Sequence, residues 1–139
     1  MSVLFTEDNY LSRKIGRYLN KEKREFRFVS GTSDALDHVL NNILEGNTNG
    51  LIFMFDDLAK SNWDGLSNKI RFLEDKNKVK TAEANVIVLL TAHEERRAYL
   101  TKRFKTCDYV LAIPADGKKL AMILEASKHN HFQIFPKSA

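Results

Sequence analysis

The chain has 139 residues, enough for one domain with its own core, and its 43% hydrophobic content excludes a disordered or low-complexity protein. Its net charge of +4 comes from 22 basic and 18 acidic residues, an excess too small and too widely spread to indicate a nucleic-acid-binding protein. A single cysteine excludes an internal disulfide, and no apolar run approaches the roughly 20 residues of a membrane-spanning helix. We therefore expect a cytoplasmic protein that contacts neither nucleic acid nor membrane directly.

Short apolar runs alternate along the chain with longer segments of helical periodicity. The runs predict strands at residues 3–6, 26–30, 51–55, 86–90 and 109–113. Apolar helical faces follow them at residues 11–19, 35–44, 66–73, 98–104 and 120–124, the last within a helix at about 116–128. Residues 31–33 predict a turn and a helix cap, Asp64 predicts the N-cap of the third helix, and residues 74–84 predict a polar connection.

The order of these elements indicates the fold. Alternating strands and helices are typical of an α/β protein with a doubly wound parallel sheet. Residues 51–55 and 86–90 are apolar throughout, as expected of strands covered by helices on both faces. Because sites in such sheets lie at the carboxyl ends of the strands, the residues that follow each strand are the candidates for function.

Acidic residues follow two of the predicted strands, and a threonine follows another. Glu7 and Asp8 come after the first strand, Asp56 and Asp57 after the third, and Thr91 after the fourth. Neighbouring carboxylates raise each other's pKa unless a cation joins them, and an all-oxygen set favours Mg²⁺. The pattern predicts a phosphoryl-transfer site with one carboxylate as nucleophile. The alternative is that these acids cap helices and form turns.

Basic residues are densest in two segments, at residues 13–24 and 96–105. Their lysines and arginines interleave with apolar residues at helical spacing, which favours solvated helix faces. A face that docks an acidic partner is the alternative. The four histidines have no metal-ligand spacing, so surface or capping roles are expected for them.

Five segments, taken in order, resemble the receiver domain of two-component response regulators over about residues 2–128, with a C-terminal tail at 129–139. They are VLFTEDNYLSRKIGRYL, SGTSDAL, FDDLAKSNWDG, VIVLLTAHEE and CDYVL. The resemblance implies a single flavodoxin-like sheet of five parallel strands in the order 2-1-3-4-5, flanked by five helices.

The resemblance also implies which aspartate reacts. The family's phosphoacceptor stands seven residues before the Asp-Gly pair that enters the third helix, and that pair is Asp64-Gly65 here. Asp57 is therefore the implied phosphoacceptor, and Asp56 is a neighbour without an assigned role. Thr91 matches the family's switch hydroxyl, and Tyr109 matches its switch aromatic residue.

A magnesium site comes with the resemblance, and Mn²⁺ is an expected substitute. The implied ligands are Glu7 through water, Asp8 directly, the Asp57 carboxylate and the backbone carbonyl of Ala59. Two departures affect this site: Lys60-Ser61 replaces the usual Met-Pro, and Ile113 replaces the lysine before Pro114. Lys60 or Lys118 is the candidate replacement for that missing charge. Because the site keeps more negative charge, we expect divalent metal binding to survive.

The leading hypothesis is a non-enzymatic signalling module that takes phosphate from a histidine kinase or phosphotransfer protein on Asp57. It would then switch a protein-binding surface formed by the fourth helix, fifth strand and fifth helix. The alternative is a pseudo-receiver that binds partners without phosphorylation, for which Ile113 is the main argument. A metal-dependent phosphatase is a weaker third reading, since the chain has no Gly-rich phosphate loop. The sequence leaves the oligomeric state open, a homodimer included.

Overall fold

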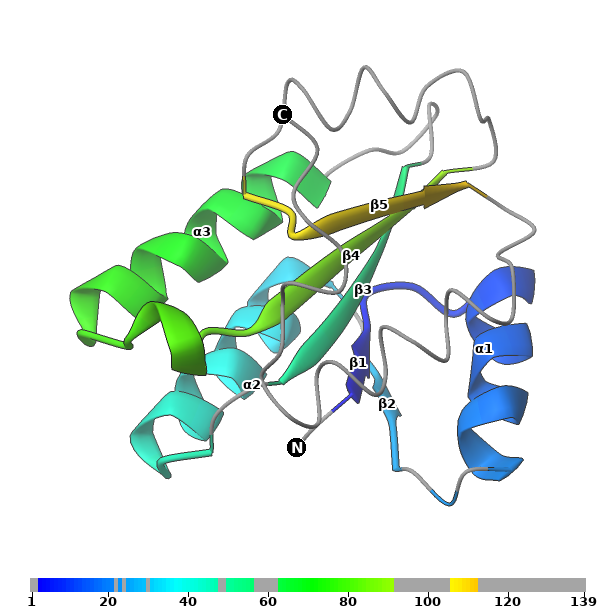
Figure 1. Cartoon of the computed structure of the whole chain (residues 1–139), viewed down its shortest axis with the longest axis horizontal. Helices are drawn as coiled ribbons and strands as arrows, with labels where there is room; N and C mark the ends of the chain where they lie inside the picture. The colour runs from blue at the N-terminus through cyan, green and yellow to red at the C-terminus, as the bar shows by residue number, and fades with distance from the viewer. Residues whose placement is uncertain are drawn as a thin grey trace.

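The computed structural model of the chain describes residues 3–21, 23, 25–29, 31–47, 50–56, 63–91 and 106–112. These residues form one parallel sheet with the strand order β2-β1-β3-β4-β5 and helices against it (Figure 1). The elements are β1 (Val3–Phe5), α1 (Tyr10–Lys21), β2 (Arg27–Phe28), α2 (Thr32–Leu44), β3 (Leu51–Asp56), α3 (Trp63–Lys76), the short 3-10 helix η1 (Thr81–Glu83), β4 (Val86–Thr91) and β5 (Tyr109–Ala112).

The predicted α/β fold with its 2-1-3-4-5 sheet is confirmed. Every pair of neighbouring strands is parallel. The helices expected at residues 98–104 and 116–128 lie outside the described residues, as does the predicted C-terminal tail. Within the described part, no helix is both long and apolar enough to cross a bilayer.

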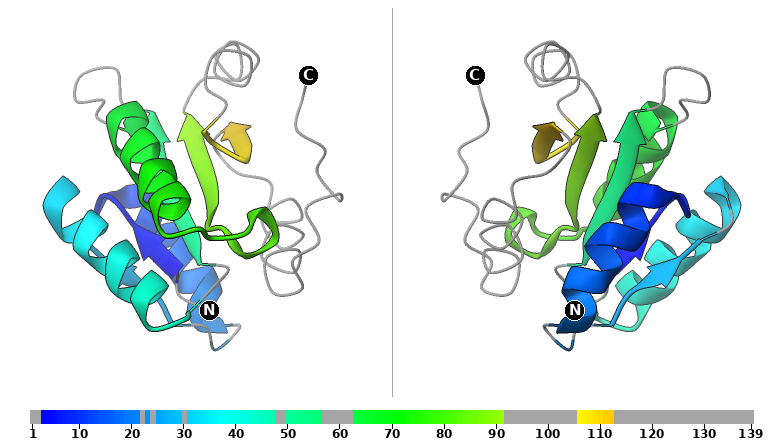
Figure 2. Two further views of the ribbon diagram at one scale, coloured as in Figure 1. Left: turned by 90° about the vertical axis from the view of Figure 1, so that its left-hand side faces the viewer. Right: turned by 90° about the vertical axis from the view of Figure 1, so that its right-hand side faces the viewer.

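Each face of the sheet has its own hydrophobic core, because α1 covers one face while α2 and α3 cover the other (Figure 2). The α1-side core consists of Val3, Phe5, Ile15, Leu19, Leu51, Phe53, Phe55, Val86, Val88, Leu90, Tyr109 and Leu111. The α2/α3-side core consists of Leu4, Val29, Ala35, Val39, Ile52, Met54, Leu66, Ile70, Ile87, Leu89 and Cys107. Residues of β3 and β4 alternate between the two cores, which is why both strands are apolar throughout.

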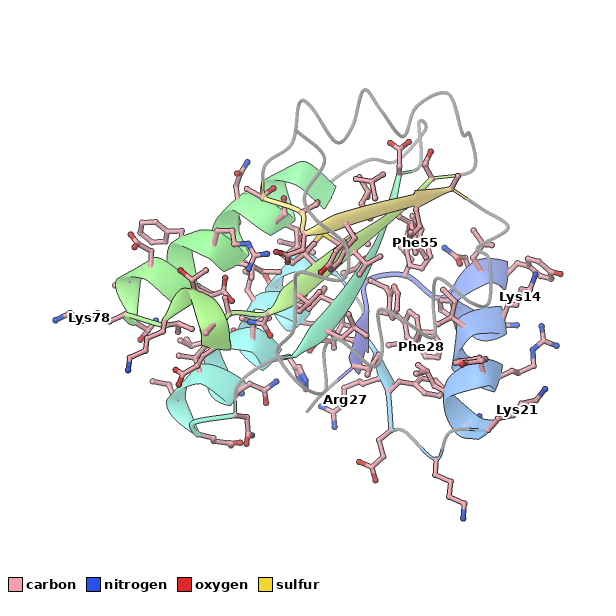
Figure 3. All side chains as sticks on the ribbon, viewed as in Figure 1. Lys14, Lys21, Arg27, Phe28, Phe55 and Lys78 are labelled. Atoms are coloured by element: carbon pink, nitrogen blue, oxygen red, sulfur yellow. The ribbon has the colours of Figure 1, made fainter. Side chains whose placement is uncertain are left out.

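Aromatic side chains of the sheet lie on the inner side of α1, and the lysines of α1 lie on its outer side. Figure 3 shows Phe28 and Phe55 directed into the space between α1 and the sheet, while Lys14 and Lys21 extend from the outer side of the helix. Phe28 stacks on Phe5 with ring centroids 5.3 Å apart. The basic residues of α1 thus occupy exposed positions, as the helical spacing predicted.

Asn9 and Ser12 fix the start of α1. The Asn9 Oδ1 atom accepts a hydrogen bond from the Ser12 backbone N–H at 2.9 Å, and Ser12 Oγ accepts one from the Asn9 N–H at 2.8 Å. This reciprocal capping satisfies backbone donors that a helix terminus leaves without partners. The helix therefore begins only five residues after β1 ends, and Glu7 and Asp8 lie in the short connection.

The other two helices begin differently from the sequence prediction. Gly31 occupies the N-cap of α2 with φ of 117°, a left-handed conformation that favours glycine, so the turn predicted at residues 31–33 is confined to Gly31. A glycine has no side chain to cap with, and Thr32 lies inside the helix. Helix α3 begins at Trp63, so Asp64 belongs to its first turn and the N-cap prediction is wrong by a residue or two.

The predicted polar connection at residues 74–84 is partly wrong, because α3 continues to Lys76 and Glu74 is buried. Glu74 belongs to a network at the amino ends of β4 and β5. Arg71 donates from Nη1 to Glu74 Oε1 and from Nη2 to Asp108 Oδ2, both at 2.7 Å. Burial acts to lower the pKa of Arg71, but the charges of Asp108 and Glu74 outweigh it and raise that pKa.

Backbone groups complete this cluster of Arg71, Glu74, Asn85 and Asp108, which we call the amino-edge network. Arg71 also donates to the carbonyl oxygens of Asn85 and Thr106, at 2.8 and 3.0 Å. Glu74 Oε2 accepts from both the backbone N–H and the side-chain Nδ2 of Asn85. Asp108 Oδ2 accepts from the N–H of Ile87 at 2.8 Å. The network therefore joins the end of α3 to the start of two strands.

Candidate functional site

The carboxyl ends of β3 and β4 bring an acid and a hydroxyl into contact. Asp56 and Thr91 are paired in the parallel register of the two strands. The Thr91 hydroxyl donates a hydrogen bond to Asp56 Oδ2 at 3.0 Å. Thr91 is fully buried and Asp56 is half-buried, so the carboxylate reaches from the solvent boundary to an interior hydroxyl.

This contact follows from the matched lengths of the two central strands. Leu51 pairs with Val86 at the start, and the register continues without a bulge to Asp56 and Thr91. Asp56 follows Ile52 and Met54 at spacings of two, so strand alternation places it on the α2/α3 side of the sheet. Thr91 follows Ile87 and Leu89 in the same way, and the two polar residues therefore meet on one face.

β1 delivers the acidic pair to the same edge of the sheet. Both the backbone N–H and the hydroxyl of Thr6 donate to the carbonyl oxygen of Phe53, at 3.1 and 3.2 Å. These bonds extend the pairing of β1 and β3 by one residue beyond the strand. Glu7, which follows, is half-buried, and Asp8 is exposed.

Asp8 forms a two-point ion pair with Arg13 of α1. The Arg13 Nε atom donates to Asp8 Oδ1 at 2.8 Å, and Nη2 donates to Oδ2 at 3.3 Å. The hydrogen bond from Arg13 lowers the pKa of Asp8, so the carboxylate is ionised at neutral pH. Both side chains are largely exposed, which makes this a pair that solvent and ions can reach.

The donor chemistry of this edge fits a hard divalent cation. Glu7, Asp8 and Asp56 offer only carboxylate oxygens, which Mg²⁺ prefers. Among the described residues, no three acidic, histidine or cysteine side chains converge on one point. The predicted ligands Asp57 and Ala59 lie outside the described residues. A metal at Asp8 would also have to replace Arg13, and the exposure of that pair makes the exchange feasible.

Tyr109 lies on the other face of the sheet from Thr91. Its side chain is buried in the α1-side core, and its Cα partner on β4 is Val88 of the same core. Thr91 is three residues beyond Val88, and an odd separation along a strand reverses the face. Burial, and then the charge of Asp108, raise the pKa of Tyr109 to about 12. The structure thus brings Thr91 together with Asp56 and does not bring it together with Tyr109.

Several residues predicted for the site are not among those described. The structure does not describe Asp57 and Ala59. It also does not describe Ile113 or the two candidate lysines, Lys60 and Lys118. β5 is described to Ala112, which pairs with Thr91. One row across the sheet therefore holds Asp56, Thr91 and Ala112.

The sequence prediction missed the role of Asp56 in this row. Spacing along the chain identified Asp57 and left Asp56 as a neighbour, because spacing does not show which residue pairs with Thr91. The available signal was the equal length of the two apolar runs, each ending in a polar side chain. Chemically, the edge combines carboxylates with a buried hydroxyl donor, an arrangement suited to binding a cation and a phosphoryl oxygen.

Comparison with known proteins gives matches at the level of structure. No family model and no curated protein sequence matches the chain. One solved structure contains the Saccharomyces cerevisiae histidine phosphotransfer protein Ypd1 and the receiver domain of its downstream response regulator Ssk1. It matches with a TM-score of 0.67 and 25% identity, covering 99% of this chain and 95% of the other.

Two bacterial structures match with lower identity. The response regulator TrrA of Thermotoga maritima, in complex with Mg²⁺ and BeF, has a TM-score of 0.60 and 19% identity, with 91% and 97% of the two chains covered. The receiver domain of the sensor histidine kinase PA1611 of Pseudomonas aeruginosa, with a magnesium ion in its active-site cleft, has a TM-score of 0.62 and 20% identity, with 89% and 93% covered. The described part of this chain therefore has the fold of a receiver domain.

Proposed function

We propose that this chain, with its receiver-domain fold, is a signalling module that accepts a phosphoryl group on Asp57. The observation that most supports the proposal is the paired end of β3 and β4, where the buried Thr91 hydroxyl lies beside the carboxylate that precedes Asp57. A preorganised hydroxyl at this position can donate to a phosphoryl oxygen in the product. The acidic connection after β1 lies at the same edge and supplies carboxylates for a cation.

The proposed donor is a phosphohistidine on a histidine kinase or a histidine phosphotransfer protein. An Asp57 carboxylate oxygen attacks phosphorus, the P–N bond breaks, and the imidazole leaves with the bond's electron pair and takes up a proton. The Ssk1 receiver domain crystallised with a phosphotransfer protein supports this class of partner. The output surface at the fourth helix, β5 and the fifth helix is part of the proposal and lies mostly outside the described residues.

Mg²⁺, with Mn²⁺ as a substitute, is the proposed cofactor. Asp8 would hold it directly and Glu7 through water, together with Asp57 and the Ala59 carbonyl. The bound ion would neutralise charge on the transferring phosphoryl group. The magnesium-containing structures of TrrA and PA1611 support the assignment. With Ile113 in place of the family's lysine, Lys60 or Lys118 would have to supply the remaining positive charge.

A pseudo-receiver that binds partners without phosphorylation is the second candidate. One observation favours it: two of the described site groups are already held by the protein, Asp8 by Arg13 and the Thr91 hydroxyl by Asp56. Phosphorylation must break both contacts. The pseudo-receiver keeps them and uses the acids as structural groups.

Phosphate incorporation separates the two candidates. The 139-residue protein is incubated with acetyl phosphate and Mg²⁺, and the intact mass is measured. We expect an increase of one phosphate, lost in Asp57→Asn and retained in the control Asp37→Asn, which changes an exposed carboxylate on α2. If the wild-type protein stays unmodified while TrrA is labelled under the same conditions, the pseudo-receiver is the correct function.

A further inference from the structure

We infer that Asp56 is a positioning residue that holds the Thr91 hydroxyl in the resting state and so competes with a phosphoryl group for it. The inference deepens the proposed function and rests on it for the identity of the competitor. Its own basis is the 3.0 Å hydrogen bond from Thr91 Oγ1 to Asp56 Oδ2 and the strand register that aligns the two residues.

Burial makes this bond selective. The Thr91 side chain is fully buried, and a buried hydroxyl needs a hydrogen-bond partner because water is not there to replace one. A hydroxyl has one proton to donate. When that proton points to Asp56, it is not directed to a phosphoryl oxygen on a neighbouring residue. The hydrogen bond is 3.0 Å long and joins residues held in register by two paired strands, so Asp56 is an effective competitor.

The backbone fixes both partners on one face. Asp56 and Thr91 continue the alternation of Met54 and Leu89, whose side chains lie in the α2/α3-side core. Ala112, the partner of Thr91 on β5, has only a methyl group as its side chain and offers no competing side-chain acceptor. Rotation about χ1 is the proposed way in which the Thr91 hydroxyl changes partner.

This arrangement biases a two-state equilibrium. The contact with Asp56 stabilises the resting position of Thr91. Thr91 moves only when its contact with the phosphoryl group is more favourable in free energy than its contact with Asp56. Removing the acceptor should therefore release Thr91 even in the absence of phosphate. The net contribution of a hydrogen bond to a charged group changes an equilibrium constant by roughly tenfold or more. We therefore expect a shift of that size in the equilibrium between the two positions of Thr91.

Two substitutions separate the hydrogen bond from the charge. Asp56→Asn keeps an acceptor oxygen and removes the charge, whereas Asp56→Ala removes both. Thr91→Val removes the donor with little change in shape. The exposed Asp37 on α2 provides the matched control, Asp37→Ala.

The first measurement needs no phosphate. The Thr91 methyl resonance is recorded by NMR on protein with ¹³C-labelled threonine methyl groups. We expect it to move in Asp56→Ala, to move less in Asp56→Asn and to stay in place in Asp37→Ala. An unchanged Thr91 methyl resonance in Asp56→Ala overturns the inference, whether or not the protein accepts phosphate.

The second measurement uses beryllofluoride with Mg²⁺ as a phosphoryl mimic and determines its apparent affinity. We expect about a tenfold gain for Asp56→Ala over the wild type, and a smaller gain for Asp56→Asn. When Thr91→Val is also present, Asp56→Ala should increase the affinity less, because only the removal of the Asp56 charge then contributes. An equal gain in both backgrounds contradicts the inference, since the hydroxyl would then play no part.

Labelling with acetyl phosphate completes the test. Asp56→Asn should still take one phosphate, and Asp57→Asn should not. If the reverse is found, Asp56 is the acceptor itself and the positioning role is wrong. If neither the wild type nor any variant is labelled, the proposed function fails, while the methyl resonance still decides whether Asp56 holds Thr91.

Discussion

The two edges of the sheet hold charged residues in opposite ways. At the amino edge, Arg71 lies between Glu74 and Asp108 and has a side chain only 24% exposed. At the carboxyl edge, the arginine that pairs with Asp8 is Arg13, whose side chain is 70% exposed. The acid–arginine ion pairs are therefore mostly buried at the amino edge and exposed to solvent at the carboxyl edge.

The difference indicates what each edge is for. Charges matched inside the protein are costly to separate, so the amino-edge network ties α3 to β4 and β5. An exposed pair is worth little to stability, and its members can exchange partners with a metal ion. Asp56 is intermediate, because its carboxylate accepts from a buried hydroxyl that can turn elsewhere. Function is expected where the contacts are easy to exchange.

Arg71→Ala should have the largest effect of the predicted substitutions, because it leaves two mostly buried carboxylates without their cation. We expect a loss of about 3 kcal/mol in the free energy of unfolding, measured by urea denaturation at pH 7. The matched control is Lys69→Ala, an exposed position on the same helix, which should change stability by less than about 0.5 kcal/mol. Similar losses for both would mean that the two edges do not differ in this way.

The pKa of Tyr109 on β5 is raised by burial in the core and by the charge of Asp108 at the amino edge. Its folded-state pKa of about 12 lies above the value of about 10 expected for unfolded tyrosine. The stabilisation from the neutral phenol is therefore complete below pH 10 and is lost as the pH rises from 10 towards 12.

Tyr109→Phe removes this pH dependence, because phenylalanine has no proton to lose. Between pH 9 and pH 11, the wild type should lose about 1 kcal/mol more unfolding free energy than the variant, measured in urea at both pH values. Tyr10→Phe, at a side chain that is 73% exposed, is the control and should behave as the wild type does. Equal losses in Tyr109→Phe and wild type would show that the phenol is not desolvated.

Arg13→Gln should have the smallest effect and should act on the carboxyl edge alone. Releasing Asp8 from its arginine frees a carboxylate for the metal, so we expect Mg²⁺ to bind about two- to fivefold more tightly by calorimetric titration. Arg17→Gln, one turn further along the exposed face of α1, is the control. Weaker binding in Arg13→Gln, or no binding of Mg²⁺ or Mn²⁺ at millimolar concentration in any of the proteins, would contradict the proposed metal site.

Much of the fold was predictable because its signals are local. Continuous apolar runs at residues 51–55 and 86–90 predicted strands buried on both faces, and β3 and β4 have residues in both cores. Alternation of strands and helices predicted the parallel sheet, and the resemblance supplied its order. Helix starts were less predictable, since Gly31 begins α2 without a side-chain cap and α3 begins at Trp63, before the expected cap Asp64.

The candidate site was predictable as a location. Residues that follow parallel strands meet at one edge whatever their identity, so Glu7, Asp8, Asp56 and Thr91 could be grouped from the sequence. The partners within that group could not be derived, because a shift of one residue in strand register would pair Thr91 with a different neighbour and reverse its face. Spacing to Asp64 selected Asp57, whereas register selected Asp56 as the residue in contact with Thr91.

The sequence by itself determined the strands, the sheet and the edge at which acids and a threonine collect, because hydrophobic period and chain order are properties of consecutive residues. Only the tertiary structure decided that Thr91 donates to Asp56, that Tyr109 lies on the opposite face and that Arg71 joins Glu74 to Asp108. Those contacts link residues up to 37 positions apart. They depend on how two cores pack against one sheet, which no single segment of the chain encodes.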